Sequence, residues 1–215
     1  VKSSRIGNNV TNETFKKYCC LLQAIVNTDM TSETAMKHTI IRIGTRGSPL
    51  ALKQATEVRD QLIEAHSLKV ENFEIVIIKT TGDRIVDRPL SSLGGKGLFT
   101  KEIEEALAEK KIDIAVHSMK DMPTKQPDNL VIDCFLKRED PRDAFISNKL
   151  EKLSQLDQTT VVGTSSLRRK AQILNLMPSV KVVEFRGNVQ TRLKKLDDGV
   201  ADCTFLAMAG LKRLG

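Results

Sequence analysis

Residues 40–52 have the sequence IIRIGTRGSPLAL, a short apolar run that leads through a polar loop into a helix start. The apolar run predicts a strand over residues 40–44. Ser48 is a preferred N-cap residue and Pro49 suits the first helical position. One apolar helix face then follows at Ala51, Ala55, Val58 and Leu62. A strand joined to a helix in this way is the repeating unit of α/β proteins.

The same alternation of apolar runs and helical patterns continues to the end of the chain. We expect further strands over residues 73–78, 112–116, 130–135, 161–163, 180–185 and 202–206. Further helices are expected to begin near Leu98, after Ser165 or Ser166, and near Val189. This order predicts α/β sheets with helices on their faces.

A charged segment, residues 137–143, contains a proline and separates two series of strands and helices. We therefore predict two small α/β domains facing each other across a cleft. Domain 1 covers residues 40–137, and domain 2 covers residues 138–215 and is expected to be incomplete. Residues 1–39 are polar, with one helical stripe at Phe15, Cys19, Leu22 and Val26. They are expected to form an N-terminal appendage that is disordered or partly helical.

Composition and charge limit the classes of partner. The 215 residues carry a formal net charge of +7, which favours anionic partners. Aromatic residues make up only 4%, with no Trp, which argues against stacking of single-stranded nucleic acid. No apolar stretch approaches the roughly 18 residues that a membrane-spanning helix needs. We therefore expect the partner to be a small polyanion, not nucleic acid or a membrane. We also expect a monomer.

The four cysteines are Cys19, Cys20, Cys134 and Cys203, and they show neither C-x-x-C spacing nor a nearby histidine cluster. A metal site and a disulfide framework are both poorly supported. We expect no metal, and a reducing compartment, the cytoplasm.

Basic residues stand where helices are predicted to begin. Arg46 precedes the start at Ser48, Lys96 precedes the start at Leu98, and Arg186 precedes the start at Val189, while Arg168 and Arg169 lie in the first turns after Ser165. A helix N-terminus carries partial positive charge, so each such base is unfavourable by about 0.3–1 kcal/mol unless an anion binds there. Loops at the carboxyl ends of strands form the ligand crevice of open α/β sheets. The pattern predicts several anion-binding positions, although a salt bridge explains any single one of them at least as well.

The segment that follows the predicted strand at 112–116 is His117-Ser118-Met119-Lys120-Asp121-Met122-Pro123. Among so many bases, the carboxylate of Asp121 is expected to stay ionised. Asp121 is then a poor general acid but a good partner for positive charge that develops on a substrate. A structural turn at Lys120 and Asp121 is the alternative. His117 is expected to be packed, and the three histidines assemble no Ser-His-Asp set.

Six ordered motifs resemble those of the porphobilinogen deaminase family, also called hydroxymethylbilane synthase. They lie at residues 43–52, 93–99, 118–121, 138–143, 163–169 and 186–193, so the resemblance runs from about residue 40 to the end of the chain. It implies a transferase of tetrapyrrole (haem) biosynthesis that joins four porphobilinogen molecules head to tail, each with loss of ammonia. It also implies a dipyrromethane cofactor held covalently through a cysteine.

The resemblance also assigns roles by matching position. Lys120 and Asp121 would be catalytic, with Asp121 contacting pyrrole N–H groups and stabilising the azafulvenium cation left when ammonia departs. The acetate and propionate groups of cofactor and substrate would be bound by Lys120 as well as by Arg46, Ser48, Lys96, Ser118, Thr164, Ser165, Arg168, Arg169, Arg186, Asn188 and Arg192.

The fold implied by the resemblance has two periplasmic-binding-protein-like (type II) α/β domains and a third α+β domain that carries the attachment cysteine. We expect the third domain and this cysteine to be absent from the 215 residues, because Cys134 and Cys203 do not match the attachment motif. The chain itself is then expected to be inactive or severely impaired.

Two other functions remain open from the sequence. A periplasmic-binding-protein-like receptor for a small polycarboxylate would have a clear signal peptide and no need for Asp121. A nucleic-acid binder would gather its bases on one exposed face and bind with a steep salt dependence.

Overall fold

The structure is a computed structural model, and it describes residues 21–24, 40–84 and 97–215. The chain divides into two compact units. The described part of the first unit covers residues 21–24, 40–47, 51–81 and 97–138, and that of the second covers residues 48–50, 82–84 and 139–215. Each unit contains a sheet and helices, which confirms the predicted α/β class.

The sheet of the first unit has five strands in the order β3-β2-β4-β1-β5. Their bounds are β1 Leu21–Ala24, β2 Ile41–Thr45, β3 Phe73–Ile77, β4 Ile114–His117 and β5 Val131–Cys134. Strand β2 runs parallel to both β3 and β4, whereas β1 runs antiparallel to β4 and β5. Because β2 and β4 are parallel neighbours, the loops that follow Thr45 and His117 leave the same edge of the sheet.

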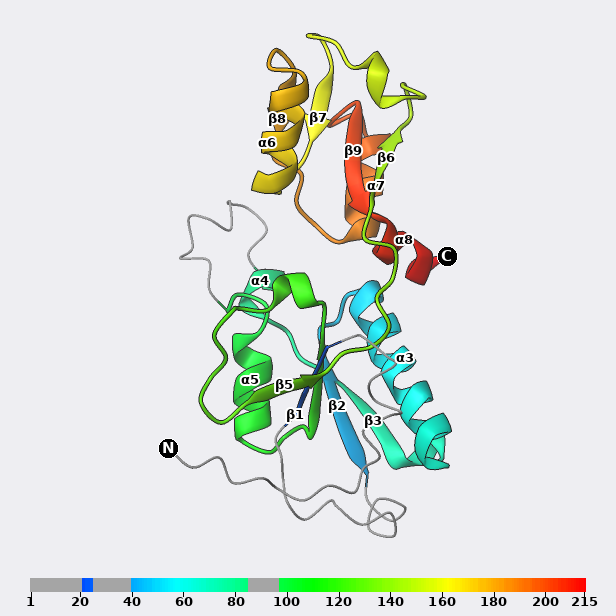
Figure 1. Cartoon of the computed structure of the whole chain (residues 1–215), viewed down its shortest axis with the longest axis vertical. Coiled ribbons are helices and arrows are strands. Elements are labelled where there is room, and N and C mark those ends of the chain that lie inside the picture. The colour runs from blue at the N-terminus through cyan, green and yellow to red at the C-terminus, as the bar shows by residue number, and fades with distance from the viewer. Residues whose placement is uncertain (1–20, 25–39, 85–96) are drawn as a thin grey trace. The chain divides into compact units, whose positions relative to one another are not determined.

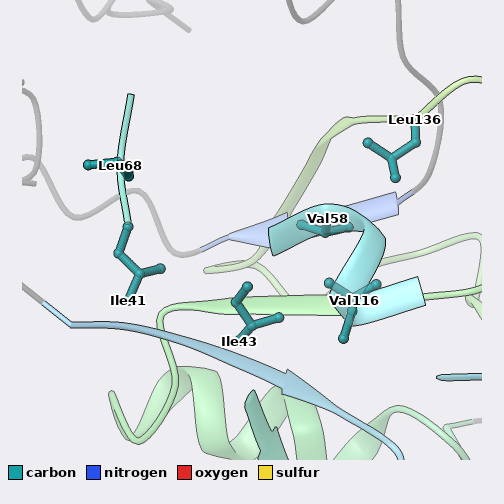
Figure 2. Packing of buried hydrophobic residues seen from close by; sticks show 7 residues of the cluster. Ile41, Ile43, Val58, Leu68, Val116 and Leu136 are labelled. Carbon is teal, nitrogen blue, oxygen red and sulfur yellow. The ribbon is translucent and has the colours of Figure 1, made fainter. Parts of the chain in front are cut away.

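Helices cover both faces of this sheet (Figure 1). Helix α3 (Pro49–His66) buries Ala55 and Val58 against Ile41, Ile43 and Val116, and Figure 2 shows this cluster. Helix α5 (Lys101–Ala108) packs on the other face. Its side chains Ile103, Ala106 and Leu107 contact Ile112 and Ala115. Adjacent residues of β4, Ala115 and Val116, thus point to opposite faces, as the two-residue period of a strand requires.

The sheet of the second unit has four strands in the order β6-β9-β7-β8. Their bounds are β6 Asp143–Ser147, β7 Val161–Gly163, β8 Lys181–Val183 and β9 Cys203–Ala207. Strand β7 is parallel to β8 and β9, and β6 is antiparallel to β9.

Three longer helices belong to the second unit: α6 Leu167–Leu176, α7 Val189–Asp197 and α8 Met208–Leu214. Ile173 of α6 packs on one face of the sheet with Val162, and Leu196 of α7 packs in a separate cluster with Val161. The remaining described helices are short: α4 Thr81–Arg84 and the 3-10 turns Val70–Asn72, Met119–Asp121 and Leu153–Gln155. No helix of the described residues is both long and apolar enough to span a membrane.

Three sequence-based expectations about the elements were wrong or incomplete. The helical stripe through Leu22 predicted partly helical structure, but residues 21–24 form β1, because pairing with β4 and β5 on both sides overrides the local pattern. The rest of residues 1–39 lies outside the described residues. Strand β6 and helix α8 were not predicted, since charged or short segments there carry little periodicity.

The third difference concerns the start of α5. The helix was expected near Leu98, but it begins at Lys101, with Thr100 as its N-cap. Gly97 has a φ of 73° and its carbonyl accepts from the N–H of Lys101 at 2.9 Å, so a turn precedes the helix. The first turn of α5 then holds two acids, Glu102 and Glu104, as is usual for a helix start.

Candidate functional site

The first group of predicted site residues lies at the carboxyl ends of β2 and β4. Arg46 follows β2 directly, and Ser118 follows β4 and leads into the 3-10 turn Met119–Asp121. The backbone N–H of Asp121 donates to the carbonyl of Ser118 at 2.9 Å. The Ser118 hydroxyl donates to Oε1 of Gln54 at 3.0 Å, and Gln54 is a buried side chain of α3. The Ser118–Asp121 motif is therefore tied to both the sheet and a helix.

Arg46 is held by an aromatic ring. Its guanidinium carbon lies 4.1 Å from the ring centroid of Phe99, a cation–π contact within the first unit. A planar guanidinium stacked on a ring keeps its edge N–H groups for other acceptors. Phe99 is the last residue of the motif at residues 93–99, but the sequence alone indicated no role for it.

His117, the last residue of β4, is packed as expected, with 5% of its surface exposed. Burial, together with the nearby charge of Arg46, lowers the pKa of His117 from 6.5 to about 4. The imidazole is therefore neutral at physiological pH. Arg46, the exposed Lys120 and the half-buried Asp121 are among the charged residues at this sheet edge.

Two further residues predicted to bind carboxylates, Ser48 and Lys96, come from nearby parts of the chain. Ser48 is half-buried and directly precedes α3, whose first turn contains no acid. Lys96 lies outside the described residues. The two acids at the start of α5 also remove the helix-start argument that was applied to Lys96, because that helix N-terminus is already compensated.

The second group lies after β7 and β8, two parallel neighbours in the second unit. Thr164 is buried, and its N–H donates to the carbonyl of Val183 at 3.0 Å. The Ser165 hydroxyl accepts from the N–H of Phe185 at 2.9 Å. Ser166 accepts from the N–H of Arg169 and is the N-cap of α6, so the second of the two candidate caps is used. These bonds fasten the two loops together and leave the Ser165 hydroxyl proton as a donor.

Arg168 and Arg169 in the first turn of α6 share one carboxylate, that of Asp143. The N–O distances are 2.8 Å from Arg168 and 2.6 Å from Arg169. Asp143 was not predicted as a site residue from the sequence, where residues 137–143 indicated a domain boundary and residues 138–143 a family motif. An acid two strands away from a pair of arginines gives no local signal.

After β8, one helix cap organises the loop. The Asn188 side chain accepts from the N–H of Thr191 at 2.8 Å and from its hydroxyl at 2.9 Å, which caps α7. Arg192 donates through Nε to the carbonyl of Gly187 at 2.8 Å, and Lys195 donates to the carbonyl of Arg186 at 3.1 Å. The Asn188 oxygen is thus occupied within the helix start.

Helices α6 and α7 have no acid in their first turns. Their N-terminal N–H groups and partial positive charge add to the arginines beside them, so both helix starts favour an anion. Carboxylates suit this environment best where guanidinium groups are exposed, as at Arg168.

The described cysteines do not offer a nucleophile at these loops. Cys203 is buried in β9, and burial together with the charge of Asp202 raises its pKa to about 11. Cys134 lies within β5. Among the described residues, no group of three or more His, Cys, Asp or Glu side chains is arranged to hold a metal ion.

Residues 41–215 match the family model of porphobilinogen deaminase, dipyromethane cofactor binding domain. The chain belongs to the porphobilinogen deaminase family. It is 68% identical over 175 residues to porphobilinogen deaminase of Paracoccus denitrificans (strain Pd 1222), a match that covers 81% of this chain and 56% of that protein.

Two plant relatives give the same family. The chain is 57% identical over 201 residues to the chloroplastic porphobilinogen deaminase of Oryza sativa subsp. japonica, with 93% of this chain and 56% of that protein covered. It is 60% identical over 181 residues to that of Pisum sativum, with 83% and 49% covered. The chain spans about half the length of these relatives.

Similarity to solved structures is weak. A solute receptor for L-cysteine of Neisseria gonorrhoeae has a TM-score of 0.37 and 16% identity, over 84% of this chain and 70% of the receptor. An ancestral cyclohexadienyl dehydratase has a TM-score of 0.34 and 14% identity, over 84% and 70%. Likenesses of this size carry no conclusion about function.

Proposed function

We propose that the chain is part of an enzyme that joins four porphobilinogen molecules head to tail, with loss of ammonia, to give hydroxymethylbilane in tetrapyrrole biosynthesis. The observation that carries the proposal is the family match over residues 41–215. The identity of 68% to the Paracoccus denitrificans protein supports the same reaction. The proposal refers to the whole protein, because this chain spans only about half the length of the relatives.

The residues present suit a ligand with several carboxylates. Arg168 is 59% exposed at a helix start without acids, and Arg46 is stacked on Phe99. Guanidinium groups and helix N-termini are both favourable sites for carboxylates. A dipyrromethane cofactor carries acetate and propionate groups, so it fits this donor set. When bound, it would supply the pyrrole chain to which new units are added.

We assign the binding of these acetate and propionate groups to the side chains of Arg46, Ser48, Lys96, Ser118, Lys120, Thr164, Ser165, Arg168, Arg186, Asn188 and Arg192. Arg46, Ser118 and Lys120 lie in the loops after β2 and β4, and the residues numbered from 164 onward lie in the loops and first helical turns after β7 and β8. Asn188 contributes chiefly by capping α7, since its oxygen accepts from Thr191.

Asp121 would stabilise the cation that forms when ammonia leaves porphobilinogen. The short turn Met119–Asp121 places it beside Ser118, whose hydroxyl bond to Gln54 fixes the turn against α3. A fixed carboxylate aimed at developing positive charge stabilises the transition state without reorganisation. The adjacent Lys120 is exposed and can hold a carboxylate of the same substrate.

The test is ammonia release from porphobilinogen by the full-length protein with Asp121→Asn. The amide keeps the shape of the side chain and removes its charge, so we expect turnover to fall by about 100-fold or more. Asp128→Asn is the matched control, since Asp128 is an exposed carboxylate of the same unit. Turnover of the Asp121 variant within a factor of about three of the wild type would refute the cation-stabilising role.

The cofactor part of the proposal has its own test in the intact mass of the protein. Cys203, buried and with a raised pKa, is not the attachment site that we expect. The full-length protein should carry the mass of a dipyrromethane, and a Cys203→Ser variant should retain it. Loss of the added mass in that variant would assign the attachment to Cys203 after all.

We also propose a monomer in the cytoplasm, where free thiols stay reduced.

A further inference from the structure

Asp143 lies where it can act on the arginines of α6. Strand β6 runs antiparallel to β9, with Asp143 opposite Ala207, the last residue of β9. Strand β7 runs parallel to β9 and leads through residues 164–166 to the first turn of α6. The first residue of β6 therefore lies at the same sheet edge as the start of α6. This edge holds Arg168 and Arg169.

Arg169 is bound on three sides. Its Nε and one terminal nitrogen donate to the two oxygens of Asp143, at 3.1 and 2.6 Å, in a bidentate pair. Its other terminal nitrogen donates to the carbonyl of Phe205 at 2.7 Å. Only 11% of the Arg169 side chain is exposed. The guanidinium thus joins α6 to both β6 and β9.

Arg168 makes far fewer contacts with the protein. One terminal nitrogen donates to Oδ2 of Asp143 at 2.8 Å, and the other lies 3.4 Å from Oε1 of Gln172. Its side chain is 59% exposed. The single bond to Asp143 restricts the direction of the side chain and leaves further N–H groups directed to solvent.

The charges of Asp143 and the two arginines are consistent with different roles for Arg168 and Arg169. Burial alone would raise the pKa of Asp143, but the hydrogen bonds from Arg169 and Arg168 outweigh it and lower that pKa below its usual value. One ionised carboxylate facing two guanidinium groups leaves one positive charge uncompensated within the trio. Because Arg169 is buried and Arg168 is exposed, that charge is presented at Arg168.

We infer that Asp143 is a positioning residue. Its bidentate pair with Arg169 holds α6 on the sheet, an arrangement that we call the latch, and its hydrogen bond to Arg168 orients that side chain. Of the two arginines, Arg168 alone then binds a carboxylate of the ligand. The inference rests on the proposed function only in taking that ligand to be porphobilinogen or the pyrrole chain built from it. It reassigns Arg169 from ligand binding to holding α6 on the sheet.

The latch is tested without any ligand, by thermal melting of the full-length protein. Arg169→Gln and Asp143→Asn should each lower the melting temperature by about 4 °C or more, and the double variant should fall no further than the larger single effect. Arg169→Lys should not restore stability, because a lysine cannot form the bidentate pair. Arg142→Gln is the control, an arginine 78% exposed that also bonds an aspartate, and should melt like the wild type.

The environments of the two arginine side chains can be followed through their Nε–H signals in ¹⁵N NMR spectra, by exchange with water and by chemical shift. The Arg169 signal should exchange slowly with water and lose this protection in Asp143→Asn. The Arg168 signal should exchange fast, and porphobilinogen should shift it while leaving the Arg169 signal in place. Additive melting effects, or a fast-exchanging Arg169 signal in the wild type, would overturn the latch.

The ligand-binding role is tested by ammonia release. Arg168→Gln should raise the KM for porphobilinogen about tenfold or more with an unchanged melting temperature. Asp143→Glu, which keeps the charge, should recover KM better than Asp143→Asn. If Arg169→Lys, assayed at a temperature where it is fully folded, raises KM as much as Arg168→Gln, the division of roles is wrong. If the wild type releases no ammonia, the proposed function has failed, and the melting and exchange results alone decide the inference.

Discussion

The buried imidazole of His117 makes the stability of the first unit depend on pH. His117 is 5% exposed and its pKa is lowered from 6.5 to about 4, first by burial and then by the charge of Arg46. The unfolded chain therefore binds a proton at a higher pH than the folded chain does. Between these two pKa values the unfolded state holds more protons, so stability increases with pH there and is lost as the pH falls.

The size of the effect follows from the two pKa values. The shift from 6.5 to about 4 corresponds to about 3 kcal/mol between pH values above and below this range. Between pH of about 7.5 and about 5, where unfolding is convenient to measure, the loss of stability is about 2 kcal/mol. The His117→Gln variant lacks the group, so its stability relative to the wild type should change by this amount.

The assay is urea unfolding at both pH values, with the midpoint and slope followed for each protein. The free energy of unfolding of the wild type, minus that of His117→Gln, should be larger by about 2 kcal/mol at the higher pH. His66→Gln is the control, since His66 is a half-buried histidine of the same unit, at the end of α3. A difference between wild type and His117→Gln that stays constant across the two pH values, or that has the opposite sign, would refute the reasoning.

Three further predictions concern the end of β7 and the loop after β8, and urea unfolding tests each of them. Gly163→Ala should destabilise by about 1–3 kcal/mol, because the added Cβ would lie 2.5 Å from the buried ring of Phe185, and wild-type stability would contradict the packing. Gly187→Ala should lower the free energy of unfolding by about 2 kcal/mol or more, because φ is 122° there and the Cβ would lie 2.5 Å from Thr191. A smaller loss of stability than that of Asn188→Ala would argue against backbone strain at Gly187. Asn188→Ala should cost about 1 kcal/mol through the lost helix cap, and Asn188→Asp, which keeps an accepting oxygen, should recover most of it.

Periodic segments with clear helix caps were predictable from the sequence. The start of α3 at Pro49, the cap of α6 and the start of α7 at Val189 all follow from local residue chemistry, and the structure confirms them. Strand β6 was not predictable, because Asp143 and its neighbours continue a charged segment and gain strand structure only by pairing with β9. The same dependence on a distant partner explains β1.

The sequence shows which residue types stand at the helix starts, but not the hydrogen bonds between them. Arginines at helix starts indicated an anion, yet nothing in the sequence showed that Arg169 is bound by Asp143 and Phe205 while Arg168 is exposed. Such pairs join residues 25 or more positions apart, and only the sheet topology brings them together. The contact of Arg46 with Phe99 is of the same kind.

Cys203 gives the second unit an internal chemical reporter. Strand β9 lies inside its sheet, between β6 and β7, and the thiol is fully buried with a pKa of about 11. At a pH of about 8 only about one thiol in a thousand is then a reactive thiolate, even before access is considered. A labelling reagent can reach the sulfur only when the sheet opens, so the rate at which Cys203 is modified measures the opening of this unit directly.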